Sequence, residues 1–312
     1  MALLMFKNLV VYRLSASGGE PWEATREAVE DGLAKARFVP CAATQPLSAG
    51  WVSPRHGDEA DNAAAPLIES VGGQWLMRLM VEQKVLPSSV VKRHVEELAK
   101  KSEQATGRKP GKRHAKELKE EAVLTLLPQA FTKRASVNVW MDTRAQLLMV
   151  DAGSAKRAEE AATMLVQSLE GLALRLVQTQ LSPAAAMTAW LADGEPPAGF
   201  SVDRECELKS ADEMKSVVRY ARHPLDTEEV RAHVVTGGKQ PTRLALTWKG
   251  RVSFVLTDTL QIKKLSVDDG LFDAGSARGD EGFEADAAIA TGELRQLIPD
   301  LVAALDGELA PA

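Results

Sequence analysis

A strongly basic segment lies within an otherwise acidic chain and limits what the chain can fold into. Between Lys84 and Lys119 the sequence carries eleven Lys/Arg and four Glu, a net charge of +7 with histidines neutral, whereas the whole chain of 312 residues has a net charge of −5. The residues outside this segment therefore sum to −12. A basic island of this kind indicates a binding surface for an anionic partner and not a general solubility device.

The basic segment also has the hydrophobic spacing of two helices. We predict a helical hairpin over residues 86–127, with Ser88 as the N-cap of the first helix and a break at Gly107–Gly111. An arc of Lys and Arg side chains would face outward from this hairpin. An ordinary solvated helix surface remains an alternative for any basic helix. The predicted apolar edge comprises Val91, Val95, Leu98, Ala115, Leu118, Ala122 and Leu126.

Length and composition indicate a globular protein of two or three compact units. The chain is 45% hydrophobic and 26% charged, which is ordinary for a soluble protein. Cys41 and Cys206 are far apart and lack the spacing of a metal or redox motif, so we expect a reduced cytoplasmic setting. No uncharged apolar run is long enough to span a bilayer, and the N-terminal apolar stretch reads as a strand and not as a signal peptide.

The order of the predicted elements favours an α+β fold with two to three subdomains, because strands and helices mix without regular β-α-β alternation. The Pro/Gly-rich stretch 194–199 predicts a boundary between an N-terminal region, 1–195, and a C-terminal region, 196–312. We predict loops at 55–66 and 267–284. The predicted strands cover 6–14, short stretches around Phe38 and Trp51, 74–85, 136–150 with a turn at 142–144, 172–177, 205–208, 216–222, 243–248 and 252–257; the predicted helices outside the hairpin cover 22–36, 154–169, 183–191, 227–236 and 292–305.

Motifs for catalysis are weak. The five histidines form no metal-binding cluster, and the chain has no glycine-rich nucleotide loop and no nucleophile elbow, so we predict no catalytic residue, metal or cofactor. Asp142 and Asp151 leave open a metal-dependent DNA-processing enzyme, since hard cations bind carboxylates. Each also has a structural explanation: Asp142 suits a turn, and Asp151 precedes a predicted helix N-terminus.

Phosphate neutralisation needs cations alone, so double-stranded DNA bound without sequence readout is the ligand that the basic residues fit best. Aromatic residues are sparse in the hairpin, which makes stacking on single-stranded bases a weaker fit. A second, weaker basic set comprises Lys215, Arg219, Arg222, Lys239, Arg243, Lys249 and Arg251. The candidate DNA-binding residues are Lys92, Arg93, Lys100, Lys101, Lys112, Arg113, Lys116, Lys119, Arg222, Lys239 and Arg243.

A third hypothesis is a protein-interaction scaffold whose hairpin binds an acidic partner. The chain's own C-terminal region is one candidate, since the residues from Ser266 onward hold eleven Asp/Glu against two Arg, a net charge of −9. Solubility, or repulsion of DNA from the outer surface, is the simpler role for that acidic region.

Several sequence strings, in order along nearly the whole chain, resemble the RdgC family. They are FKNLVVYRL from Phe6, GWVSP from Gly50, LPSSVVK from Leu86, LLPQAF from Leu126, VDAGSAKRAEE from Val150, WLADGEPPAGF from Trp190, LALTWKGRVSFVL from Leu244 and TGEL from Thr291.

The resemblance implies a bacterial, nucleoid-associated and non-enzymatic DNA-binding protein. It implies a toroidal homodimer that encircles duplex DNA, with single-stranded DNA as a further ligand, and that inhibits RecA-promoted recombination. Two separate interfaces would close this ring. The resemblance assigns Phe131, beside Gln129 where the family often has Arg, to one of them. It assigns Arg222 and His223, where the family often has a basic residue followed by Gln, to the other.

Overall fold

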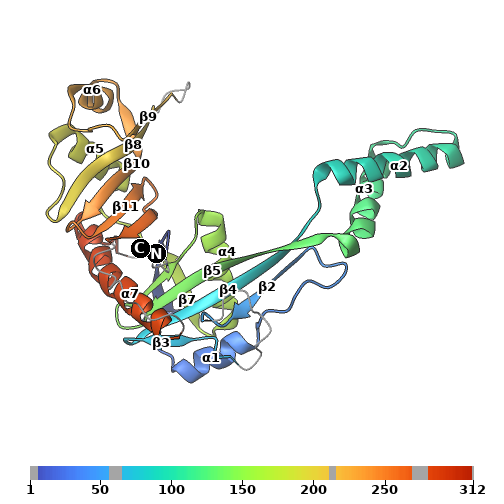
Figure 1. Cartoon of the computed structure of the whole chain (residues 1–312), viewed down its shortest axis with the longest axis horizontal. Helices are drawn as coiled ribbons and strands as arrows, with labels where there is room; N and C mark the ends of the chain where they lie inside the picture. Colours follow the sequence, from blue (N-terminus) through green and yellow to red (C-terminus); the bar gives the residue numbers. More distant parts are fainter. Residues whose placement is uncertain (1–5, 56–64, 211–215, 269–279, 311–312) are drawn as a thin grey trace.

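The computed structural model describes residues 6–55, 65–210, 216–268 and 280–310. The molecule is curved, with a helical projection at one end and a smaller sheet at the other (Figure 1). Both sheets are antiparallel, which confirms the α+β prediction. The predicted loop at 55–66 and the Gly/Asp-rich part of 267–284 lie largely outside the described residues, as does Lys215.

The larger sheet has seven strands in the part of the chain that the structure describes, in the order β2-β4-β5-β6-β1-β7, with β3 paired to β4. The ladder between β4 and β5 is its longest, running from Trp75 opposite Met141 to Val85 opposite Phe131. Its strands are β1 (Val10–Ala16), β2 (Leu47–Val52), β3 (Glu69–Val71), β4 (Gln74–Val85), β5 (Phe131–Asp142), β6 (Leu147–Val150) and β7 (Leu172–Leu176).

Alternation along these strands gives the larger sheet two apolar faces. Val10, Met77 and Val139 point to the face that α1 (Arg26–Ala34) and α4 (Ala155–Ser168) cover, where Leu33 and Leu165 are fully buried. The N-caps of both helices follow the usual chemistry: the side chains of Thr25 and Ser154 accept hydrogen bonds from Ala28 N and Arg157 N.

The opposite face of the larger sheet packs against the C-terminal half of the chain. That half forms a smaller sheet, five-stranded within the described residues, in the order β12-β11-β10-β8-β9. Trp248 lies fully buried beneath α7 and donates its indole N–H to Asp300 at 2.9 Å. The elements are α5 (Pro183–Asp193), β8 (Phe200–Ser210), β9 (Val217–Ala221), α6 (Glu228–Arg231), η2 (Ala232–Thr236), β10 (Lys239–Trp248), β11 (Val252–Thr257), β12 (Ile262–Val267) and α7 (Asp280–Ala303).

The chain just before β1 joins the two sheets. Leu9 and Ile262 exchange backbone hydrogen bonds of 2.7 and 3.0 Å, and Leu265 N donates to Lys7 O. Phe6, fully buried, packs its ring 5.8 Å from that of Trp140 on the larger sheet. One continuous core therefore runs through both sheets.

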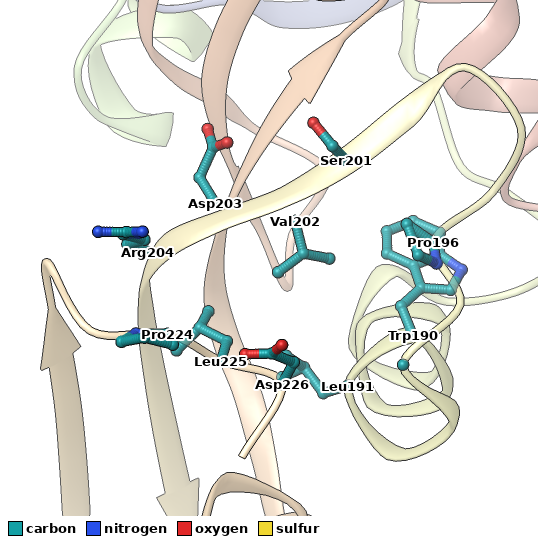
Figure 2. Close-up of a pocket in the computed structure, with 11 residues that line it drawn as sticks. Trp190, Leu191, Pro196, Ser201, Val202, Asp203, Arg204, Pro224, Leu225 and Asp226 are labelled. Carbon is teal, nitrogen blue, oxygen red and sulfur yellow. The ribbon is translucent and has the colours of Figure 1, made fainter.

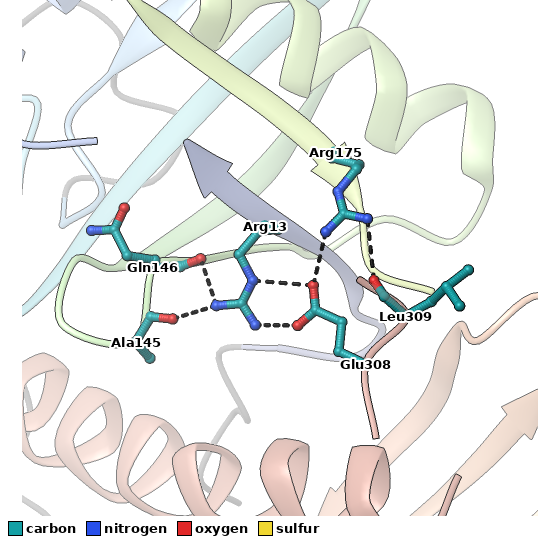
Figure 3. Close-up of polar contacts among 6 residues, drawn as sticks. All are labelled: Arg13, Ala145, Gln146, Arg175, Glu308 and Leu309. Atoms are coloured by element: carbon teal, nitrogen blue, oxygen red, sulfur yellow. Dashed lines mark hydrogen bonds and ion pairs between the residues drawn. The ribbon is translucent and has the colours of Figure 1, made fainter. Parts of the chain in front are cut away.

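The C-terminal segment clamps the other side of β1. The carboxylate of Glu308 forms ion pairs with Arg13 of β1 and with Arg175 of β7, as Figure 3 shows. Arg13 also donates to Ala145 O at 2.6 Å, and Leu309 N donates to Gln178 O at 2.8 Å. The last described residues thus lie beside the edge of the larger sheet.

Most predicted elements are confirmed, and β4 has the predicted bounds. The helix predicted over 22–36 is shorter, because Thr25 caps it. Phe38 lies in no strand and instead donates its N–H to Trp51 O. Pro87, and not Ser88, occupies the N-cap of the hairpin's first helix, which has no side-chain cap hydrogen bond. Strand β12 was not predicted, and the last helix begins at Asp280 instead of Gly292.

The ion pairs of Glu308 with Arg13 and Arg175, which we call the Glu308 clamp, should stabilise the folded chain. Glu308→Gln should lower the free energy of unfolding by about 1–2 kcal/mol, because the guanidinium groups of Arg13 and Arg175 keep their charge but lose the carboxylate that they pair with. Denaturant titration measures the change, with Glu170→Gln, at an exposed site, as the matched control. Equal stability of the two variants would contradict a clamping role.

Candidate nucleic-acid interface

Both predicted helices of the basic segment are present and project from the long β4–β5 ladder (Figure 1). They are α2 (Ser88–Thr106) and α3 (Lys112–Leu126); with residues 127–129 and the linking residues we call them the helical arm (residues 86–129). Gly107 ends α2 in the left-handed conformation, at φ +70°, which glycine adopts without steric cost.

The arm has only a thin apolar core. Val91, Leu118 and Ala122 are buried where α2 and α3 pack together, while Ala115, which was predicted on the apolar edge, is exposed. Ser102 and His114 link the two helices through a side-chain contact of 2.9 Å. Most of the arm surface is therefore available to a partner.

All eight candidate cations of the arm are solvent-exposed. Three of them pair with glutamates of their own helix: Lys92 with Glu96 at 4.0 Å, Arg113 with Glu117 at 3.3 Å, and Lys116 with Glu120 at 3.8 Å. Exposed pairs of this type are weak, about 0.3–0.5 kcal/mol, so an anionic ligand can compete for them. The other five, which form no ion pair with any described residue, are Arg93, Lys100, Lys101, Lys112 and Lys119.

Lys84 belongs to the basic segment by sequence but has a structural role. Its ammonium donates to Leu127 O at 2.9 Å and to Ala43 O at 2.6 Å, which ties the end of the arm to the loop before β2.

A buried ion pair supports the same base of the arm. Burial raises the pKa of Glu82, but hydrogen bonds from Arg134 Nε and Cys41 N outweigh burial and hold that pKa below its ordinary value. Arg134 also lies over the ring of Phe38. The arm thus starts from a fixed platform.

The candidate cations of the C-terminal region lie on the smaller sheet, at the opposite end of the curve (Figure 1). Arg222 is exposed at φ +56° just after β9, and Arg243 is exposed on β10. Lys239 Nζ lies 3.3 Å from His233 Nδ1. The structure therefore does not bring these three together with the arm cations. Of the same basic set, Arg219, Lys249 and Arg251 pair with Glu207, Asp300 and Glu293.

Phe131 is the most exposed large apolar side chain among the described residues, at 87%. Val85, which is opposite Phe131 in the β4–β5 ladder, is also exposed, as are Leu124 of α3 and Gln129. A groove of about 980 Å³ lies beside them, between the end of β4, α2 and α3. An exposed aromatic residue next to an apolar groove is typical of an interface. The groove is lined by Gln83, Lys84, Val85, Leu86, Ser88, Val91, Lys92, Val95, Glu96, Lys119 and Val123.

His223 lies next to two residues, Arg204 and Pro224, that line a hollow in the smaller-sheet half of the molecule. Its N–H donates to Arg204 O, and its ring is 5.3 Å from that of Tyr220. The adjoining hollow, of about 500 Å³, lies between α5, β8 and the loop at 224–226, with Val202 at its centre (Figure 2). Arg222 and His223 follow β9 of the smaller sheet, whereas Phe131 begins β5 of the larger sheet.

The two carboxylates considered for metal chemistry have local partners. Asp142 accepts hydrogen bonds from Arg144 N and Ala145 N in the predicted turn, and it pairs with Arg295 at 3.0 Å. Asp151 accepts from Lys7 N and Asn8 N, and burial raises its pKa. Among the described residues no group of three or more His, Cys, Asp or Glu is placed to hold a metal. No described helix is both long and apolar enough to cross a membrane.

One group of cations was not singled out from the sequence. Lys7, Lys156, Arg157 and Lys263 come from three distant segments, which the N-terminal segment and β12 bring together. A partial signal was present: Lys156 and Arg157 occupy the first turn of a capped helix, where acidic residues are the usual choice.

The chain matches the family model described as "Putative exonuclease, RdgC" over residues 4–308. It is 45% identical over 315 residues to the recombination-associated protein RdgC of Dechloromonas aromatica, covering 99% of this chain and 100% of the relative. The proteins of the same name from Cupriavidus pinatubonensis and Bordetella pertussis are 43% and 39% identical, each over 98% of this chain and 99% of the relative.

Proposed function

The chain belongs to the RdgC family of recombination-associated proteins, and we propose that it is a non-enzymatic protein that binds double-stranded DNA without sequence preference. We further propose that it acts in the nucleoid as a ring-shaped homodimer and inhibits RecA-promoted recombination by occupying the duplex.

The single observation that carries DNA binding is the helical arm. Its eight exposed candidate cations either lack an ion pair with any described residue or hold a weak one, and they project away from the acidic remainder of the chain. Phosphate contacts from such side chains supply affinity without base readout.

One candidate interface patch lies at each end of the curved subunit, which supports a homodimer whose two copies meet at two separate interfaces. Phe131 offers an aromatic anchor beside an apolar groove at the arm end, and Arg222 and His223 lie exposed or half-buried at the other end. A two-fold dimer buries the same patch on both copies, so two separated patches on a curved subunit would leave an opening between the copies.

Removing arm charge should weaken DNA binding on all sequences alike. In a Lys112→Ala, Arg113→Ala and Lys116→Ala triple variant, each lost phosphate contact should lower the slope of log affinity against log salt by about 0.9. Fluorescence anisotropy with duplexes of several sequences, between 50 and 200 mM salt, measures this slope.

The matched control removes three exposed cations outside the arm, through Lys35→Ala, Arg144→Ala and Lys209→Ala. The control variant and the arm variant therefore lose the same amount of positive charge. An arm variant that loses no more affinity than this control, or loses it on one sequence alone, contradicts DNA binding by the arm. If the affinity of the unsubstituted protein for duplex DNA does not change with salt concentration, the proposed function itself is wrong.

Phe131→Ala should weaken dimerisation roughly 10- to 150-fold, because burying such a side chain contributes about 1.5–3 kcal/mol. Sedimentation velocity over a dilution series reports the shift, with Val166→Ala on α4, also an exposed apolar site, as the control. Identical sedimentation of both variants at low concentration rules out this interface.

A metal-dependent exonuclease is the second candidate, because the description of the matching family model carries that activity. Incubation of linear duplex DNA with excess protein and Mg²⁺ or Mn²⁺ decides between the two. We expect intact DNA. Shortening that a chelator stops, and that Asp142→Asn or Asp151→Asn abolishes, would establish the exonuclease instead.

A further inference from the structure

We propose that Lys7, Lys156, Arg157 and Lys263 form a second phosphate-binding surface, separate from the helical arm, which we call the junction patch. The proposal rests on the proposed DNA binding and deepens it, because it names a further set of residues that contact the backbone.

Printed contacts between three chain segments assemble the junction patch. Lys263 Nζ of β12 donates to Gly153 O, just before α4, at 3.2 Å. Lys7 N donates to Asp151 Oδ1 at 3.2 Å, and Leu265 N donates to Lys7 O at 2.9 Å. The residues before β1, the start of α4 and β12 therefore meet at one place on the surface, where the two sheets join.

The cations of the junction patch are available to a ligand. Lys7, Lys156 and Arg157 are exposed and Lys263 is half-buried. Lys156 forms an exposed pair with Glu160 at 3.9 Å, which is weak. Lys7, Arg157 and Lys263 form no ion pair with any described residue.

Two nearby carboxylates are already engaged, whereas Glu159 of α4 is exposed and forms no ion pair with any described residue. Asp151 turns to the backbone N–H groups of Lys7 and Asn8. Glu205 pairs with Lys264, the neighbour of Lys263 on β12. The four cations of the patch outnumber Asp151, Glu159 and Glu160, so the patch keeps a net charge of 4 − 3 = +1 in a chain whose net charge is negative.

Two of these cations lie where positive charge lowers the stability of their own helix. Lys156 and Arg157 lie in the first turn of α4, where the helix dipole disfavours positive charge by about 0.3–1 kcal/mol per residue. Neither residue gains a strong partner within the described chain in return. Residues that break a local rule without internal compensation are typical of functional surfaces.

Duplex DNA is the polyanion that fits the patch, because the four cations come from different elements and suit a row of phosphates more than one compact anion. Helix starts with nearby cations also commonly contact the DNA backbone. The patch should act together with the arm and should not read sequence.

The test compares two triple variants of the full-length protein. Lys7→Gln, Arg157→Gln and Lys263→Gln remove the three patch cations that form no ion pair with a described residue, and Lys35→Gln, Arg144→Gln and Lys209→Gln are the charge-matched control. Anisotropy with a 30-base-pair duplex between 50 and 200 mM salt should show a salt slope reduced by about 0.9 per lost contact in the first variant only. Combining the patch and arm substitutions should lower the slope further.

A patch variant with the slope and affinity of the control overturns the proposal, while loss of binding in the arm variant alone leaves the proposed function standing. If the patch triple variant does not fold, Arg157→Gln alone decides, because that side chain is exposed and forms no ion pair with any described residue. A slope unchanged by Arg157→Gln then overturns the proposal.

Discussion

The packing of the two sheets against one another sets the geometry on which every surface feature depends. Val11, Leu76, Trp140 and Met149 form one row across four strands of the larger sheet, and they share a core with the smaller sheet. Burying a large apolar side chain contributes about 1.5–3 kcal/mol, so this row resists separation of the halves. The two sheets, from which the arm and the Arg222 region extend, are therefore held together by one core.

Electrostatics divides the cations of this protein into two groups. Arg13, Lys84 and Arg134 hold the fold together through partners on other elements. The arm cations have exposed partners on their own helix or none among the described residues. Side chains of the first group are too engaged to meet a ligand, whereas those of the second can exchange water and counterions for phosphate. Net charge by segment could not separate the two groups, because Lys84 lies in both the basic segment and the framework.

The spacing of hydrophobic residues was sufficient to predict local elements, including both arm helices and β4. Each of these elements buries one face, and that face can be recognised from the sequence of the element alone. The spacing failed for β12 and the first half of α7, where glycine, aspartate and short apolar runs are typical of a loop until tertiary contacts are known. The resemblance to the family pointed to Phe131, but only the tertiary structure shows that its side chain is exposed. For the proposed junction patch the sequence carried only a partial signal, Lys156 and Arg157 at the start of a helix, because residues 7 and 263 approach that helix only through tertiary contacts.

The Glu308 clamp bears on how fast the chain can fold. Arg13 and Glu308 lie 295 positions apart in the sequence, and Leu9 and Ile262 are almost as distant. Contacts between residues so far apart close long loops, and chain entropy is lost before such contacts stabilise the fold. The junction of the two sheets and the contacts of Glu308 should therefore form late in folding, after the hairpins within each sheet.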